Sequence, residues 1–93
     1  MLDLKKLQTF HVAAATGNFT RAAAELGCCQ SSVTVHIKAL EDELGFPLFE
    51  RCRFSKTVKL TDVGRQMLEY SHKLLALAEE TTASIRRRQV KDP

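Results

Sequence analysis

Apolar residues recur every three or four positions along most of the chain, a spacing that predicts amphipathic α-helices. The first helix follows Asp3, its expected N-cap, and ends at Gly17 and Asn18. A second helix is expected to start with Thr20 as its N-cap and to end at Gly27, because glycine accepts left-handed backbone angles. The stripe of the first helix is expected to consist of Leu4, Leu7, Phe10, His11 and Ala14, and that of the second of Ala22, Ala23 and Leu26.

A third helix is predicted to start at Gln30, directly after the glycine turn. Spacings of four, three and four residues separate its apolar positions, which are Val33, Ile37, Leu40 and Leu44. At about 100° per residue, the opposite face carries Ser31, Val35, Lys38 and Asp42, with Thr34 on its flank. Two short helices that meet at a glycine turn, the second with a polar outer face, are typical of a helix-turn-helix.

The polar face of the third helix carries the side-chain chemistry that reads DNA. A glutamine such as Gln30 can form two hydrogen bonds with adenine, and serine and threonine hydroxyls reach bases or phosphates. The open N–H groups of a helix start attract phosphate oxygens, and no acidic residue follows Gln30 before Glu41. An ordinary three-helix packing element without a special function has a similar pattern, so the periodicity alone leaves both interpretations open.

After the third helix the pattern changes to that of a β-hairpin. Gly45 ends the helix and Pro47 prevents its continuation. The apolar residues expected to return to the core are Phe46, Leu48 and Phe49. A short two-stranded hairpin, or wing, is predicted by the even spacing of Phe54, Val58 and Leu60.

Positive charge is concentrated in this hairpin. The net charge of +3, from 14 Lys and Arg against 11 Asp and Glu, is mild. A segment without acids nevertheless holds four cations, Arg51, Arg53, Lys56 and Lys59. A basic loop beside a polar helix is the electrostatic pattern of phosphate binding, and a solvated basic loop is the alternative.

From Thr61, the expected N-cap, the pattern stays helical for about 25 residues, which is long for a helix of a small domain. The preceding part of the chain is too short to cover the whole apolar stripe of this helix. We therefore expect a homodimer in which residues 61–89 of two copies pair in an antiparallel or crossing manner, and a helix folded back on its own core is the alternative. The expected dimerisation residues are Gly64, Met67, Leu68, Ser71, Leu74, Leu75, Ala78, Thr82 and Ile85.

Composition is that of an ordinary globular domain, with 44% hydrophobic and 27% charged residues in 93. No apolar run is long enough to span a bilayer and the N-terminus has no signal-peptide core, so we expect a cytoplasmic protein without membrane contact. Three cysteines, an odd number, do not indicate a disulfide framework. The sequence has no catalytic set and no cofactor motif, so we expect neither an enzyme nor a cofactor.

A metal site is not expected either. The spacing of two to four residues that is usual for structural zinc ligands does not occur among Cys28, Cys29, Cys52, His11, His36 and His72. We expect His11 to be a packed, hydrogen-bonded residue, and His36 and His72 to lie on helix surfaces. Cys29, at a helix start, is a candidate redox switch; a packed turn residue and a substitute cap are the alternative roles of Cys28 and Cys29.

Several segments resemble one known family, the N-terminal DNA-binding domain of LysR-type transcriptional regulators. They are LQTFHVAAATGNFTRAAAEL, the helix start at Gln30, IKALEDELGFPLFER and LTDVG, which together span nearly residues 4–64. The resemblance implies a mainly α fold, with a winged helix-turn-helix head in residues 1–60 and a dimerising linker helix in residues 61–89. It also implies a C-terminal ligand-sensing domain of periplasmic-binding-protein type. We therefore expect residues 90–93 to be a tail or the start of a linker, and tetramers only in a full-length protein.

The resemblance implies double-stranded DNA as the partner, with an interrupted inverted repeat as the site that a dimer reads. It places the first turns of the third helix against the bases and the wing against the backbone or the minor groove. The residues expected to contact DNA are Thr20, Arg21, Gln30, Ser31, Ser32, Thr34, Val35, Lys38, Arg51, Arg53 and Lys56.

Three features depart from the family's pattern. Cys29 replaces the serine that usually precedes the glutamine, and sulfur is a weak acceptor, so we expect a poorer N-cap. Val35 replaces a frequent arginine and can pack on a thymine methyl group, with a tolerated surface valine as the alternative. Residues 52–59 are expected to form a hairpin about two residues longer than is usual in the family.

A helical protein-interaction module without specific DNA binding is the alternative function of the chain. The salt dependence of duplex binding distinguishes it from a DNA-binding domain, because phosphate contacts release counterions and contacts with a protein partner do not.

Overall fold

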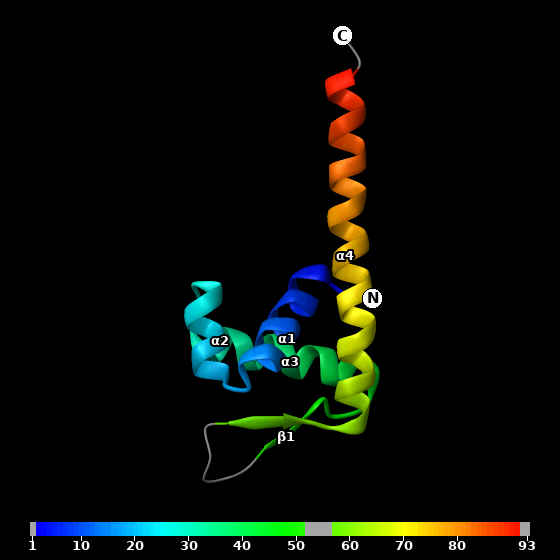
Figure 1. The fold of residues 1–93 in the computed structure, drawn as a ribbon. Helices are drawn as coiled ribbons and strands as arrows, with labels where there is room; N and C mark the ends of the chain where they lie inside the picture. Colours follow the sequence, from blue (N-terminus) through cyan, green and yellow to red (C-terminus); the bar gives the residue numbers. More distant parts are fainter. Residues whose placement is uncertain (1, 52–56, 92–93) are drawn as a thin grey trace.

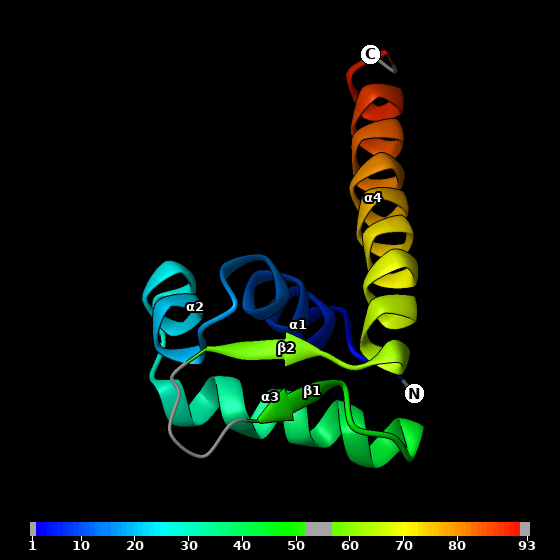
Figure 2. The same cartoon turned by 60° about the horizontal axis from the view of Figure 1, so that its bottom comes forward.

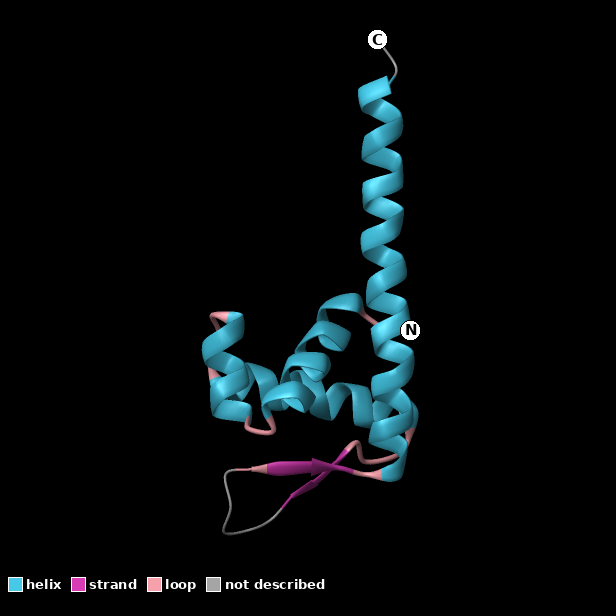
Figure 3. Ribbon diagram, viewed as in Figure 1, coloured by secondary structure: helices cyan, strands magenta, loops and turns pink. Residues whose placement is uncertain are grey.

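The computed structural model describes residues 2–51 and 57–91, which form four helices and a two-stranded antiparallel sheet. Helices α1 to α3 and the sheet form a head, and α4 extends from it, so the molecule measures 59 × 26 × 19 Å (Figure 1). Figure 3 shows that most of the described chain is helical, as the sequence predicts. In chain order the elements are α1 (Leu4–Thr16), α2 (Phe19–Leu26), α3 (Gln30–Leu44), β1 (Phe49–Arg51), β2 (Val58–Leu60) and α4 (Asp62–Lys91).

The core lies where α1, α2, α3 and β1 meet. Aromatic rings tie the sheet to the helices, because the ring of Phe49 lies 5.5 Å from that of Phe10 and 5.3 Å from that of Phe19. The other core side chains, all at most 7% exposed, are Leu7, Ala13, Ala22, Ala23, Val33, Ile37, Leu40, Leu48 and Met67.

The start of α2 differs from the expectation. Asn18, and not Thr20, is the N-cap, since its side-chain oxygen accepts hydrogen bonds from the N–H groups of Thr20 and Arg21 at 2.9 and 3.1 Å. Asn18 has an extended backbone with φ of −153°, which aims the amide at these donors and places Thr20 inside the helix. Gly17 and Gly27 end α1 and α2 with φ of 66° and 70°, as expected.

The buried face of α1 is broader than the expected stripe and does not include Leu4. Leu4 is 50% exposed, whereas Thr9 and Ala13 are buried. The physical reason is that α1 packs against α2, α3 and α4 at the same time, so its buried surface is wider than one stripe, and Leu4 lies in the first turn beyond it.

The hairpin also starts earlier than expected. Strand β1 begins at Phe49 and pairs with β2 in the register Phe49 to Leu60 and Arg51 to Val58. Val58 N–H donates to the carbonyl of Gly17 at 2.9 Å, which fastens the sheet to the turn between α1 and α2. Phe54, expected to start the hairpin, lies outside the described residues.

Phe46 was expected in the core and is 59% exposed, while Leu48 and Phe49 are buried. The polypeptide turns at this point. Leu48 N–H donates to the Glu41 carboxylate at 2.8 Å and Thr61 N–H donates to the Leu48 carbonyl at 3.0 Å, so the backbone is fixed with Leu48 inward and Phe46 outward.

Helix α4 begins as expected and runs two residues beyond the expected end, to Lys91. Thr61 caps it, because Thr61 Oγ1 accepts from Gly64 N–H at 3.0 Å. No helix in residues 2–51 and 57–91 has the combined length and apolar character of a membrane span.

The apolar side of α4 is divided between the head and the solvent. Gly64, Met67 and Ser71 are buried against their own chain, so the expectation that these three face a second copy is wrong. The cause is that the first turns of α4 pack on α1 and β2. Three of the other expected dimerisation residues are half-buried, namely Leu68, Leu75 and Ala78. The remaining three are exposed, namely Leu74, Thr82 and Ile85.

Replacing Gly64 with alanine is expected to destabilise the head. An added Cβ would overlap the carbonyl oxygen of Leu48 and lie 3.0 Å from Leu60 Cδ2. In an open helix the same change would stabilise by about 1 kcal/mol through helix propensity. The overlap with backbone decides the sign here, and we expect a loss of about 1–3 kcal/mol in urea unfolding. Ser84→Ala, in the exposed part of α4, is the control, with a change within about 0.5 kcal/mol. A stabilised Gly64→Ala protein would contradict the packing described.

Candidate nucleic-acid interface

Helices α2 and α3 and the turn at Gly27 form a helix-turn-helix unit. Figure 2 shows α3 running along one side of the head, from below α2 to the base of α4. Its inner positions Val33, Ile37 and Leu40 are 0% exposed, so the helix is anchored along this stripe. The start of α3 at Gln30 and its anchoring stripe are both as predicted.

The outer face of α3 carries the side chains predicted for it. Ser31, Val35 and Lys38 are exposed, and Val35 has 63% of its surface accessible. Ser32 and Thr34 are half-buried on the flanks. This part of the face therefore offers hydroxyl groups, a cation and one apolar side chain, without an acidic group.

The amide of Gln30 is held by a neighbour on α2. Thr20 Oγ1 donates to Gln30 Oε1 at 3.1 Å, and both side chains are at the surface. The bond occupies one of the two acceptor positions of the amide oxygen and leaves the amide N–H groups open. Thr20 and Gln30, which were predicted as separate DNA contacts, are thus joined by a hydrogen bond. Periodicity within each helix does not predict this bond.

Two further side-chain bonds tie α3 to the head. His36, expected on the helix surface, is half-buried, and its Nδ1 lies 2.9 Å from Thr9 Oγ1 on α1. At the other end of α3, the Glu41 carboxylate accepts from Leu48 N–H at 2.8 Å. The sequence signals of periodicity do not predict either bond, because the partners come from other elements.

The first turn of α3 has a weak cap. Cys29 is the N-cap residue, and its side chain makes no cap hydrogen bond, as expected for sulfur in place of a hydroxyl. Its carbonyl accepts from the N–H groups of Ser32 and Val33 at 3.0 and 3.4 Å. Cys28 and Cys29 are both free and exposed. The expectation that Cys28 is a packed turn residue is therefore wrong.

Only part of the wing lies within the described residues. Arg51 lies in β1 and Lys59, which is exposed, in β2. Arg53 and Lys56, predicted to follow the DNA backbone, lie outside the described residues, as does most of the segment expected to be long. Arg21 is exposed on α2, the helix that precedes α3.

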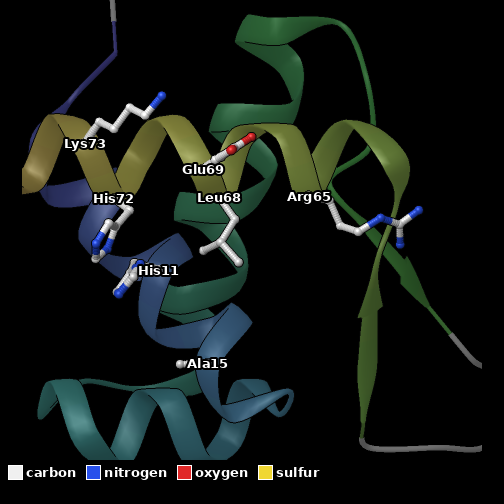
Figure 4. Close-up of a pocket in the computed structure, with 7 residues that line it drawn as sticks. All are labelled: His11, Ala15, Arg65, Leu68, Glu69, His72 and Lys73. Atoms are coloured by element: carbon white, nitrogen blue, oxygen red, sulfur yellow. The ribbon is translucent and has the colours of Figure 1, made fainter.

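A groove lies between α1 and α4 and is lined by residues of these two helices. The rings of His11 and His72 stack there with centroids 5.9 Å apart, and the groove has a volume of about 440 Å³ (Figure 4). Among the described residues, His11 Nδ1 is buried without a hydrogen-bond partner while its ring packs on His72, so the expected packing is confirmed and the expected hydrogen bond at this atom is not found. The described residues contain no group of three or more His, Cys, Asp or Glu that could hold a metal ion.

A family model described as "Bacterial regulatory helix-turn-helix protein, lysR family" matches residues 4–65. The chain belongs to the lysR family. The match runs from α1 into the first turn of α4, so the helix-turn-helix and the sheet of this lysR-family chain lie within it. The family is one of regulators and not a class of enzymes.

Relatives of this lysR-family chain include two HTH-type transcriptional regulators of Bacillus subtilis (strain 168). YwqM is 48% identical over 79 residues, which are 85% of this chain and 26% of the relative. CzcR is 46% identical over 79 residues, which are 85% of this chain and 27% of the relative. The chain therefore spans about a quarter of the length of these relatives.

Solved structures of the same fold include two DNA complexes. The CbnR DNA-binding domain bound to DNA has a TM-score of 0.88 and 31% identity, with 95% of this chain and 99% of that chain covered. The BenM DNA-binding domain on catB site 1 DNA has a TM-score of 0.86 and 32% identity, with 92% and 93% covered. These matches confirm the winged helix-turn-helix fold and the family that the sequence indicates.

Replacing Cys29 with serine is expected to stabilise the start of α3. A serine hydroxyl at the N-cap accepts a hydrogen bond from an open N–H of the first turn, and such a bond contributes about 0.5–2 kcal/mol. Thermal and urea unfolding of Cys29→Ser measure the gain. Cys28→Ser, which changes the neighbouring exposed thiol outside the cap position, is the matched control and is expected to shift stability by less than about 0.5 kcal/mol. Equal effects of the two substitutions would show that capping is not the cause.

Proposed function

We propose that this chain is the DNA-reading head of a transcriptional regulator and that it binds double-stranded DNA sequence-specifically, with α3 in the major groove. The observation that carries the proposal is the division of α3 into a wholly buried apolar stripe and an exposed face of amide, hydroxyl and cationic groups. An α-helix with its side chains is about 10–12 Å wide, which fits a major groove about 12 Å wide. The likeness to two DNA-binding domains that were solved in complex with DNA supports duplex binding by this fold.

The roles within α3 follow from side-chain chemistry. Gln30, oriented by Thr20, donates its amide N–H groups to acceptors on a base edge. Ser31 and Lys38 reach bases or phosphates, and the open N–H groups of the first turn face phosphate oxygens. Arg21, and by the family resemblance Arg51, Arg53 and Lys56, supply further phosphate contacts.

The distal half of α4 supports a homodimer in this proposal. Leu74, Leu77 and Ile85 are 39%, 58% and 54% exposed, and their spacings of three and eight residues gather them on one side of the helix as an apolar patch of the kind that marks an interaction surface. Pairing with the same helix of a second copy covers them, and a two-fold dimer reads an interrupted inverted repeat. A tetramer belongs to a longer protein with a ligand-sensing domain, as the family resemblance implies.

The proposal gives the chain a binding role without catalysis or a cofactor, in the cytoplasm, where a bacterial regulator meets its DNA. The alternative is a helical protein-interaction module without specific DNA binding. The two functions differ in their electrostatics, since only a duplex partner carries a dense row of phosphates with condensed counterions.

Duplex binding measured at several salt concentrations tests the proposal. Affinity is expected to fall steeply, by about 10³-fold or more between about 50 and 200 mM salt if six or more phosphates are contacted. Arg21→Ala and Lys38→Ala are each expected to reduce the slope by about one unit. Lys5→Ala, an exposed cation on α1, is the control and leaves the slope unchanged. Absence of duplex binding at low salt would favour the protein-interaction module.

Val35 is expected to recognise a thymine methyl group at one position of each half-site. It is the apolar side chain at the centre of the exposed face, with 63% of its surface accessible. Replacing that thymine with uracil removes only the methyl group, and the wild-type protein is expected to lose affinity by a few fold, about 1 kcal/mol for the buried methyl. Val35→Ala is expected to bind both duplexes nearly equally. If the ratio of affinities for the thymine and uracil duplexes is the same in both proteins, Val35 does not contact the methyl group.

A further inference from the structure

Apolar packing sets which face of α3 is buried, and directional contacts add to it by setting the fine rotation of the helix. Val33, Ile37 and Leu40 are fully buried, but the hydrophobic effect that holds them has no direction. Base-edge hydrogen bonds are far more demanding, because they weaken steeply when the angle departs from linear. A binding constellation has to be held within about 0.5 Å and 10–20° of its productive geometry. Directional bonds between α3 and the head therefore define how the exposed face of α3 around Val35, the reading face, is oriented toward DNA.

The bond between Thr9 and His36 is directional and lies inside the head. Thr9, on α1, is only 4% exposed. Its Oγ1 lies 3.1 Å from the carbonyl oxygen of Lys5 and 2.9 Å from His36 Nδ1. It joins two helices through residues that are 27 positions apart in the chain.

The donor and acceptor roles in this pair follow from proton counting. A threonine hydroxyl has one proton, and here it donates that proton to the Lys5 carbonyl, which can only accept. With the hydroxyl proton donated to the Lys5 carbonyl, the lone pairs of Thr9 Oγ1 accept from a hydrogen on His36 Nδ1, and this is the tautomer that lets both bonds form at once. The bond keeps this direction whether or not Nε2 carries a second proton, because Nδ1 is a donor in both forms of the ring.

His36 lies near the middle of α3, so its bond to Thr9 restrains the helix close to the centre of the exposed face. His36 directly follows Val35 and lies two residues before Lys38, within the same turn as the centre of the reading face. The other two side-chain bonds described above act near the ends of the helix, at Gln30 and at Glu41. The bond to Thr9 is therefore the one that acts at the middle of α3.

We propose that His36 is a positioning residue for base recognition, and that its Nδ1–H bond to Thr9 fixes the rotation of α3 on α1 and thereby the sequence specificity of the head. The inference rests on the proposed DNA-binding function. It adds a residue that does not contact DNA to those that determine which sequence is bound. Phosphate contacts tolerate a small rotation of the helix, because a charge–charge attraction falls off gradually with distance, whereas base-edge bonds do not.

The test measures the ratio of affinities for two duplexes at low salt, one selected from random DNA by the wild-type protein and one with the same composition in scrambled order. Thr9→Val removes the hydroxyl at nearly constant size, and His36→Ala removes the donor. Both are expected to lower the affinity for the selected duplex about tenfold, which is the size of one lost base contact. The affinity for the scrambled duplex is expected to stay unchanged.

Conservative variants separate this role from simple stability. His36→Asn places an amide N–H near the position of Nδ1 and is expected to retain the ratio, as is Thr9→Ser. His36→Gln places its amide farther out, near the position of Nε2, and is expected to behave as His36→Ala. The double variant with Thr9→Val and His36→Ala is expected to lose no more than either alone, because one bond is removed once.

Thr16→Val is the control for a merely structural role. Thr16 is a half-buried threonine of the same helix whose Oγ1 lies 3.0 and 3.1 Å from the carbonyl oxygens of Val12 and Asn18, within α1 and its exit turn, and donates its one proton locally. It is expected to lower the melting temperature without changing the ratio.

The inference is overturned if Thr9→Val and His36→Ala leave the ratio unchanged, if they weaken both duplexes equally, or if Thr16→Val lowers the ratio as much. A wild-type protein that binds neither duplex would instead remove the proposed function itself, so the two failures are distinguishable.

Discussion

The burial of one stripe of α3 against the rest of the head is the constraint on which the reading surface depends. Val33, Ile37 and Leu40 leave no accessible surface, and helix geometry then fixes which positions can point outward. The hydrophobic effect, which is not sequence-specific, thus determines which side chains of α3 are available for specific recognition. Three side-chain bonds described above add directional restraints on the orientation of α3. Each connects the helix to a different part of the head: α2, α1 and the backbone that enters β1.

The sequence predicts the parts of this arrangement that depend on residues close together in the chain. The stripe and start of α3, its exposed face at Val35 and the weak cap at Cys29 all follow from spacing and side-chain chemistry within one helix. The cap of α2 was misassigned because Asn18 and Thr20 both have suitable oxygens, and only the extended backbone at Asn18 decides between them. The bond between Thr9 and His36 joins different helices, and no periodic signal reports it.

Helix α4 shows how one sequence pattern can serve two surfaces. Its small and apolar residues recur along its length, so the sequence offers no marker of where the head ends. Near Gly64 the absence of a side chain lets the helix lie directly on the backbone at Leu48. Farther along, Leu77 and Ile85 continue the pattern over solvent. Tertiary packing, and not periodicity, divides the helix into an intramolecular part and a part left for a second copy.

The aromatic cluster of Phe10, Phe19 and Phe49 also bears on how the protein folds. A two-stranded sheet is at best marginally stable by itself in water, and β1 and β2 have three residues each within the part of the chain that the structure describes. Their pairing depends on Phe49 being received between rings from α1 and α2, and on the bond from Val58 to Gly17. The hairpin and the helices therefore form a single cooperative folding unit, in which the strands acquire their order from the helical core.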